Sequence, residues 1–296
     1  MDPAVRFNFE LSRPPAGLAR PDWGIAISFV GAAVLILLPA WKDIWRIGTT
    51  DEECNYVLLA PVVIGWLIWV RRGLLRNCPV RRGWVGLLIL AVGWVIYRHG
   101  YVTDPVVWRA GAVVIAVGAF VSAVGFDAAW RLAPALAAAI FLIPVDPNGR
   151  YHIAAPLQTA TADATQRICD LFGIYVQRAG NLLSINGVDV TIAEACNGSR
   201  MVLTLFLVCY VVAFTIPLRW YFRALLLAAS PLVAIVANVV RLVPTVWMFG
   251  HTSNHAAETF HDVSGWVMTV LAFGFLMGIF KLLQDEPTPV PQAKRR

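Results

Sequence analysis

Three side chains whose chemistry suits acyl transfer lie far apart in this sequence: Cys196, Arg241 and His261. A thiolate is a nucleophile for carbonyl carbon, and a fixed cation stabilises the oxyanion that forms. An imidazole near neutral pH can take up and return a proton. The three residues therefore form a candidate catalytic set, provided that the fold brings them together.

Cys196 lies just before an apolar run, in the segment Ala-Cys-Asn-Gly-Ser-Arg at 195–200. We expect the thiol near a helix N-terminus, where the partial positive charge favours the thiolate. Asn197 or Ser199 would cap that helix, and Gly198 would admit a substrate backbone. The alternative interpretation is a small buried cysteine at a loop–helix junction.

Arg241 lies inside an apolar stretch, with Asn238 three residues earlier on the same helical face. An arginine at membrane depth costs several kcal/mol and indicates a functional site, although snorkelling to the interface is the alternative. Pro231 and Pro244 are expected to kink or end this helix. His261 opens the last apolar run, and a single interfacial histidine is more often structural.

The composition predicts a membrane protein. Of 296 residues, 58% are hydrophobic and 14% charged, with a mean hydropathy of +0.67. A soluble chain could not bury that apolar surface in one core. The net charge of +6 falls in short basic clusters between apolar runs, which argues for orientation signals and against nucleic-acid binding.

The apolar runs predict an all-α polytopic protein with about eight transmembrane helices. The fifth run is the least regular, because Arg131 and Pro134 lie near its start. The expected spans are 24–41, 55–70, 83–101, 107–126, 129–145, 199–216, 221–243 and 263–283.

Basic clusters follow the second run, precede the seventh and end the chain, at 71–82, 219–223 and 294–296. With eight spans all three clusters fall on one side, which the positive-inside rule makes cytoplasmic. The segments 146–198 and 244–262 are then outside, in the compartment that contains the candidate site. The prediction is one integral membrane domain over 1–296, with a polar leader (1–23) and a cytoplasmic tail (284–296).

The outer segment 146–198 has structure of its own. Residues 151–172 are too polar to span a membrane and predict an interfacial helix. Beyond it, alternating apolar residues flank Asn186-Gly187, a strong hairpin signal. The register would pair Ile185 with Val188 and Leu183 with Val190. This small β-hairpin leads directly to Cys196.

The chain resembles the exosortase and archaeosortase family of membrane-embedded enzymes. The resemblance rests on three segments in order, 195–200, 238–241 (Asn-Val-Val-Arg) and 260–265 (Phe-His-Asp-Val-Ser-Gly). It implies a nucleophilic Cys196, an essential Arg241 and a third catalytic group at His261, with no cofactor and no metal. It also implies a thiol protease or transpeptidase that acts through a thioester, with water or an amine as the final acceptor.

The resemblance further implies the partners: secreted proteins that end in a short motif, a hydrophobic helix and a basic tail, processed at the inner membrane on its periplasmic side. Arg200, Asn238 and Arg178 are expected to contact the substrate, and membrane lipid surrounds the enzyme. Each arginine is equally explained as a solvated loop residue. Two positions depart from the family pattern, Asn197 where serine is common and Cys54-Asn55-Tyr56 where a histidine is common.

Two other functions compete with this one. Histidine and glutamate residues spaced four, three and three apart could ligate zinc in a metal-dependent intramembrane hydrolase: His251, His255, Glu258 and His261. A transporter or assembly factor would instead use Arg241 along a polar pathway. Of the five cysteines, Cys54 and Cys169 would share the outer compartment and could form a disulfide.

Overall fold

A computed structural model describes residues 22–75, 84–191, 198–216 and 218–284. It divides into two compact units, which are described separately. Unit 1 comprises Met1–Ile44 and Ala60–Ile143, and unit 2 comprises Trp45–Leu59 and Pro144–Arg296. Both are mainly helical, as predicted. The predicted leader and tail lie largely outside the described residues.

Unit 1 contains α1 (Trp23–Ile36), most of α3 (Tyr56–Arg71), α4 (Val85–Thr103) and α5 (Pro105–Val124). The first predicted span is not straight, because α1 and α2 (Leu38–Thr50) meet at 85°. Pro39, which lacks the N–H that would continue α1, follows this bend. The fifth predicted span is broken near Arg131 and Pro134 into α6 (Phe126–Arg131), α7 (Ala133–Ala137) and η3 (Ala138–Leu142).

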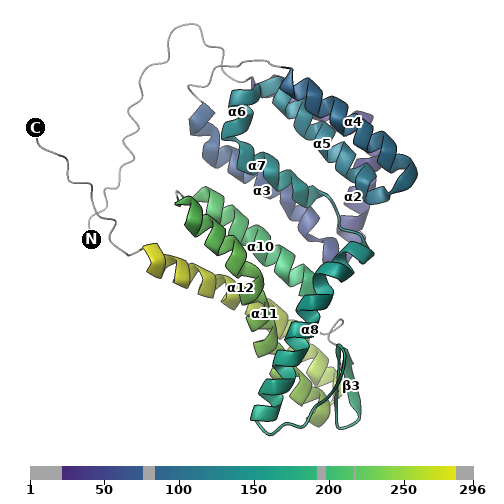
Figure 1. The fold of residues 1–296 in the computed structure, drawn as a ribbon, viewed down its shortest axis with the longest axis vertical. Coiled ribbons are helices and arrows are strands. Elements are labelled where there is room, and N and C mark those ends of the chain that lie inside the picture. The colour runs from purple at the N-terminus through teal and green to yellow at the C-terminus, as the bar shows by residue number, and fades with distance from the viewer. Residues whose placement is uncertain (1–21, 76–83, 192–197, 217, 285–296) are drawn as a thin grey trace, which may run out of the picture. The chain divides into compact units, whose positions relative to one another are not determined.

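Glycines allow α4 and α5 to pack backbone to backbone (Figure 1). Gly86, Gly93 and Gly100 recur every seven residues on α4, and Gly111 and Gly118 do so on α5. A Cβ at any of the five would overlap the facing helix. Close approach of this kind is how helices associate where lipid replaces water.

Unit 2 combines α10 (Gly198–Thr215), α11 (Trp220–His251) and α12 (Asn254–Gln284) with α8 (Pro147–Leu171) and a small sheet. Helices α10 and α12 both pack on α11 (Figure 1). The helices extend beyond the predicted spans 221–243 and 263–283, since α11 continues through Pro244 to His251 and α12 begins at Asn254. Membrane helices tolerate proline because side chains can satisfy the freed carbonyls. At Pro231 the Ser230 hydroxyl donates to the Leu227 carbonyl at 2.9 Å.

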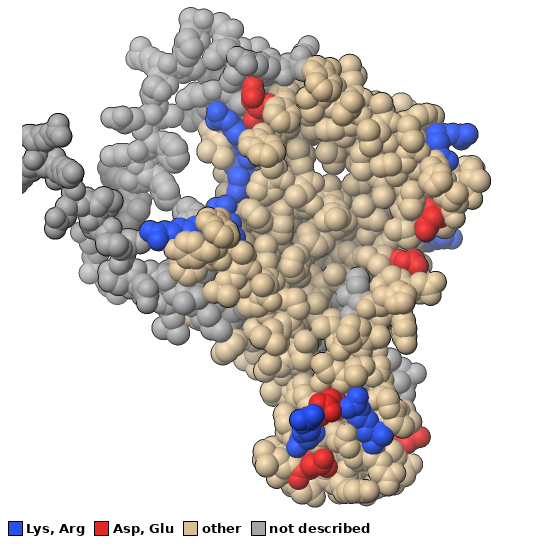
Figure 2. Space-filling model, viewed as in Figure 1, with Lys and Arg blue, Asp and Glu red and all other residues tan. Residues whose placement is uncertain are grey.

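The hairpin prediction is confirmed. Strands β2 (Leu182–Ile185) and β3 (Val188–Thr191) pair with Ile185 opposite Val188 and Leu183 opposite Val190. A third strand, β1 (Gln177–Ala179), adds to β2 and was not predicted. The preceding α8 confirms the predicted helix at 151–172, which is not among the candidate spans. Figure 2 shows charges of both signs gathered over α8 and the sheet.

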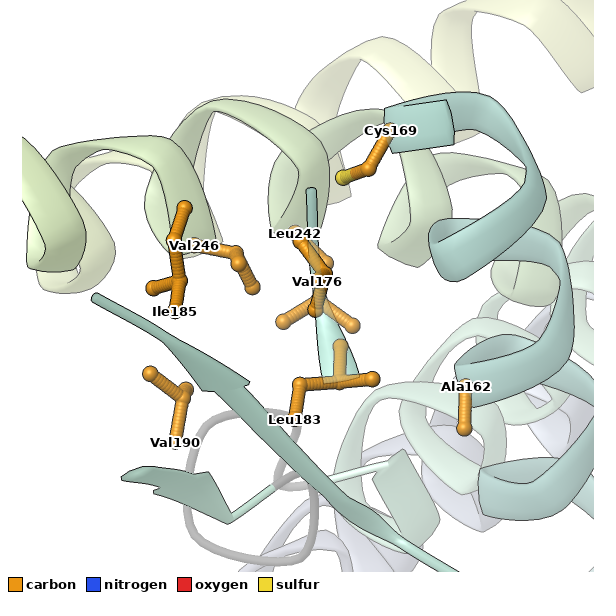
Figure 3. Close-up of a cluster of buried hydrophobic side chains, with 8 residues drawn as sticks. All are labelled: Ala162, Cys169, Val176, Leu183, Ile185, Val190, Leu242 and Val246. Carbon is orange, nitrogen blue, oxygen red and sulfur yellow. The ribbon is translucent and has the colours of Figure 1, made fainter. Parts of the chain in front are cut away.

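The inward face of the sheet forms the core of unit 2 together with α8 and α11 (Figure 3). The core residues are Ala162, Cys169, Val176, Leu183, Ile185, Val190, Leu242 and Val246. Apolar residues alternate along β2 and β3, so that the apolar face of the hairpin is turned toward these helices. The sheet is thereby held against the C-terminal third of α11.

The described residues contain four helices that are long and apolar enough to cross a membrane, or five if the bent α1–α2 pair counts as one span. The predicted number of eight is therefore not confirmed. The four are Tyr56–Leu75, Val85–Thr103, Pro105–Val124 and Trp220–His251, while Ala133–Leu142 and Val202–Thr215 are shorter apolar helices.

Candidate active site

Arg241 and His261, twenty residues apart in the sequence, meet between α11 and α12. The guanidinium Nη2 lies 3.0 Å from His261 Nε2. Arginine has no acceptor atom, so it must be the donor and Nε2 the acceptor. In this arrangement the imidazole is neutral and carries its proton on Nδ1.

Arg241 and the neighbouring Asn238 are enclosed by protein, whereas His261 is half-buried. Arg241 is only 6% exposed, and Asn238, one helical turn earlier, is 5% exposed. The Oδ1 of Asn238 has no hydrogen-bond partner among the described residues. Buried polar groups are normally hydrogen-bonded. An acceptor of this kind beside a buried cation marks a place where a ligand's N–H group could bind.

Gly265 provides room for the Arg241 guanidinium. It follows His261 by one turn of α12, and a Cβ at this position would lie 2.9 Å from Arg241 Nη1. His261 and Gly265 thus act on the guanidinium from one face of α12. His261 provides a hydrogen bond, and Gly265, which has no side chain, leaves the space that the guanidinium occupies. Sequence reasoning noted Gly265 only as part of a motif and missed this role.

Helix length indicates the depth of the pair in the bilayer. At 1.5 Å per residue, Trp220 at the start of α11 is about 31 Å from Arg241, and Lys281 near the end of α12 is about 30 Å from His261. The hydrocarbon core is about 30 Å thick. If Trp220 and Lys281 mark one interface, as aromatic and cationic residues commonly do, Arg241 and His261 lie at the other.

Cys196 lies outside the described residues, and α10 begins two residues after it, at Gly198. The start of α10 at this point agrees with the predicted helix after the cysteine. Arg200 lies in the first turn of α10, and its side chain is not among those described. The predicted proximity of Cys196 to the Arg241–His261 pair thus stays a prediction.

Arg178 is bound within the protein. Its Nη1 lies 3.1 Å from Asp163 Oδ1, and its Nε donates to the Gly180 carbonyl at 2.8 Å. These contacts fasten β1 to α8. A substrate carboxylate at Arg178 would have to share the guanidinium with Asp163.

The predicted metal ligands divide between two helices. His251 ends α11, where it stacks on Trp247 and contacts the Trp247 carbonyl at 2.9 Å. His255, Glu258 and His261 belong to α12. Among the described residues no three His, Cys, Asp or Glu side chains are grouped as a metal would require. The geometry therefore offers the zinc hypothesis no support.

A second polar cluster lies where α8 begins. Arg150 binds Asp51 at 2.7 Å and Glu53 at 3.0 Å, and its Nη1 is 2.8 Å from Cys54 Sγ. Burial raises the pKa of the Cys54 thiol above 9, although the Arg150 guanidinium opposes this shift. Arg150 thus has two carboxylate partners within the protein.

The cysteines predicted to share the outer compartment are not joined. Cys54 lies beside Arg150, whereas Cys169 lies in the apolar core of unit 2. Both are free thiols. The disulfide considered from sequence is therefore absent from this structure.

Comparison with protein families gives one match. The model of the transmembrane exosortase family matches residues 41–278, which include the segment of Cys196 as well as Arg241 and His261. Comparisons with curated proteins and with solved structures give no match. Because the match covers most of the chain, this membrane protein belongs to the transmembrane exosortase family.

Proposed function

We propose that this protein is a membrane cysteine protease or transpeptidase that cleaves a carboxy-terminal sorting signal from secreted proteins. The observation that carries the proposal is the hydrogen bond between the buried Arg241 and His261, in a chain that belongs to the exosortase family. A buried cation held by a neutral base is suited to acyl transfer.

In the proposed reaction Cys196 is the nucleophile. As the Arg241 guanidinium turns from His261 Nε2 to the carbonyl oxygen of the scissile peptide bond, the freed Nε2 takes the proton of the Cys196 thiol, and the sulfur attacks the carbonyl carbon. Arg241 stabilises the negative charge that develops on the carbonyl oxygen. His261 then returns the proton to the leaving nitrogen as the C–N bond breaks, which leaves a thioester on Cys196.

The thioester is resolved by a second nucleophile. Water would give hydrolysis, and an amine would give a new amide bond. In either case His261 accepts the proton of the incoming nucleophile, and the Cys196 sulfur leaves. Both acceptors are compatible with the same three residues.

Asn238 is the substrate contact that the structure favours most. Its unpartnered Oδ1 can accept a hydrogen bond from a substrate main-chain N–H. Arg200 and Arg178 are the proposed partners of an acidic side chain in the sorting signal. The enzyme would lie in the inner membrane with this site on the periplasmic side, surrounded by lipid.

The test is cleavage of a co-expressed substrate that ends in a recognition motif, an apolar helix and a basic tail. Cys196→Ala, Arg241→Gln and His261→Ala should each abolish cleavage while inserting in the membrane like the wild type. Cys209→Ala is the matched control, because Cys209 is a buried thiol in the same helix that follows Cys196. Cleavage by the Cys196→Ala variant would overturn the thiol mechanism, and sensitivity of that cleavage to a chelator would favour the metal-dependent hydrolase.

A further inference from the structure

The tip of the β2–β3 hairpin is bound to the end of α11 through Asn186. This residue has a φ of 53°, in the left-handed region that two-residue hairpin turns require and asparagine tolerates. Its side-chain Nδ2 donates to the Gly250 carbonyl at 3.0 Å. One asparagine therefore both forms the turn and attaches it to α11.

Gly250 allows the hairpin to approach this closely. A Cβ on Gly250 would lie 2.8 to 3.0 Å from three carbons of the Ile185 side chain, which is shorter than a real contact. Ile185 is 2% exposed, so it has no space into which to move. Any larger residue at 250 would push β2 away from α11.

The hairpin also packs on the segment of α11 that carries Arg241, through residues that precede the turn. Ile185 and Leu183 pack with Leu242 and Val246 in the core of unit 2 (Figure 3). Leu242 is fully buried and directly follows Arg241. The hairpin and the guanidinium are thus fixed to the same two turns of α11.

We propose that Asn186 and Gly250 are positioning residues that hold the nucleophile within reach of Arg241. This inference rests on the proposed function, in which Cys196 is that nucleophile. Strand β3 ends at Thr191, and five further residues can extend at most about 18 Å. Fastening the hairpin to α11 consequently limits how far Cys196 can lie from the segment that carries Arg241.

The sheet offers a matched control at its other turn. Asn181, between β1 and β2, donates through Nδ2 to Gln158 Oε1 on α8 at 3.0 Å. Asn181→Gly would remove an asparagine hydrogen bond between sheet and helix, as Asn186→Gly would. The difference is that Asn181 binds α8, whereas Asn186 binds the helix of Arg241.

The experiment measures kcat and KM of the full-length enzyme in lipid nanodiscs for a sorting-signal substrate. Asn186→Gly keeps the turn and should lower kcat about tenfold, since small displacements of reacting groups are costly, while KM changes less than about twofold. Asn181→Gly should retain at least about half of the wild-type kcat. Equal kcat values for the two variants would overturn the proposal.

A covalent replacement of the hydrogen bond tests the same inference by rescue. The Cβ atoms of Ile185→Cys and Gly250→Cys would be near enough for a disulfide. When combined with Asn186→Gly, the oxidised pair should restore kcat and the reduced pair should not. A disulfide that forms, as seen by mass, without restoring kcat would contradict the positioning role.

Failure of the proposed function would look different. If Cys196→Ala retains cleavage, the nucleophile is wrong and so is the role of the hairpin, whether or not the disulfide forms. If Cys196→Ala is inactive and Asn186→Gly is as active as Asn181→Gly, only the positioning inference fails.

Discussion

Two arginines in unit 2, Arg150 half-buried and Arg241 buried, have different kinds of partners. Arg150, at the start of α8, binds the carboxylates of Asp51 and Glu53. Arg241, in α11, binds the neutral imidazole of His261. The first arrangement joins a cation to anions, whereas the hydrogen bond of the second leaves the charge of the cation unchanged.

The difference separates a structural cation from one suited to catalysis. The carboxylates neutralise Arg150, which ties the turn at 51–54 to α8. A hydrogen bond to a neutral imidazole orients the guanidinium without itself neutralising it, which suits a cation that stabilises charge appearing during a reaction.

Arg241→Gln should lower the rate of substrate cleavage by about 10²- to 10³-fold, the usual loss when one group that stabilises an oxyanion is removed. Arg150→Gln should leave the rate per folded enzyme within about threefold of the wild type, because its charge is already neutralised. The measurement is cleaved substrate per membrane-inserted enzyme. Comparable losses in both variants would remove the functional contrast between the arginines.

Gly265→Ala should lower the rate by about 10- to 100-fold, because its Cβ would displace the guanidinium from His261. Gly274→Ala is the matched control on the same helix, since a Cβ there meets nothing within 4 Å. Both substitutions add one methyl group to α12. A Gly265→Ala enzyme as active as Gly274→Ala would show that the position of Arg241 is not critical.

Arg150→Gln should lower the free energy of unfolding by about 2 kcal/mol, through the loss of hydrogen bonds to charged groups. The measurement is thermal unfolding of the purified protein in detergent. Arg167→Gln provides the comparison, because the Arg167–Asp163 pair has side-chain exposures of 78% and 46%. Exposed pairs contribute under about 1 kcal/mol, so a similar loss in both variants would argue against Arg150 as a structural clamp.

The Cys54 thiol should resist alkylation at pH 7 to 8, because its raised pKa keeps it protonated and because the side chain is buried. Because the folded state binds this proton more tightly than the unfolded state, the associated stability is present below pH 9. It is lost as pH rises through the folded-state pKa. Mass spectrometry of alkylated peptides should show Cys54 labelled in denaturant well before it is labelled in the native protein, and rapid native labelling would contradict this.

The sequence predicted the hairpin more accurately than the helices around it. Alternation about Asn186-Gly187 determines a register, because a slip of one residue would expose every apolar side chain of the hairpin. The long C-terminal end of α11 could not be predicted in the same way, since Pro244 is a helix breaker in water and is tolerated in this helix. The added strand β1 has only three residues, too few for a periodic pattern.

The candidate site was predictable in residue type and less so in geometry. Arg241 and His261 stood out because charged and titratable groups are rare in such apolar runs. Their hydrogen bond depends on where α12 begins, and the predicted last span, 263–283, starts later than the helix does. The contribution of Gly265 depends on an interhelical distance, which no local sequence pattern encodes.

The glycine contacts between α4 and α5 also bear on how the protein assembles. The two helices are separated only by Asp104, so their association closes a very short loop and costs little chain entropy. We expect this helical hairpin to form as soon as both helices have entered the bilayer, before the distant segments of the chain meet. A cysteine crosslink between the two helices, followed during synthesis, would report this order. The other helices of unit 1 would then pack onto the α4–α5 pair after it has formed.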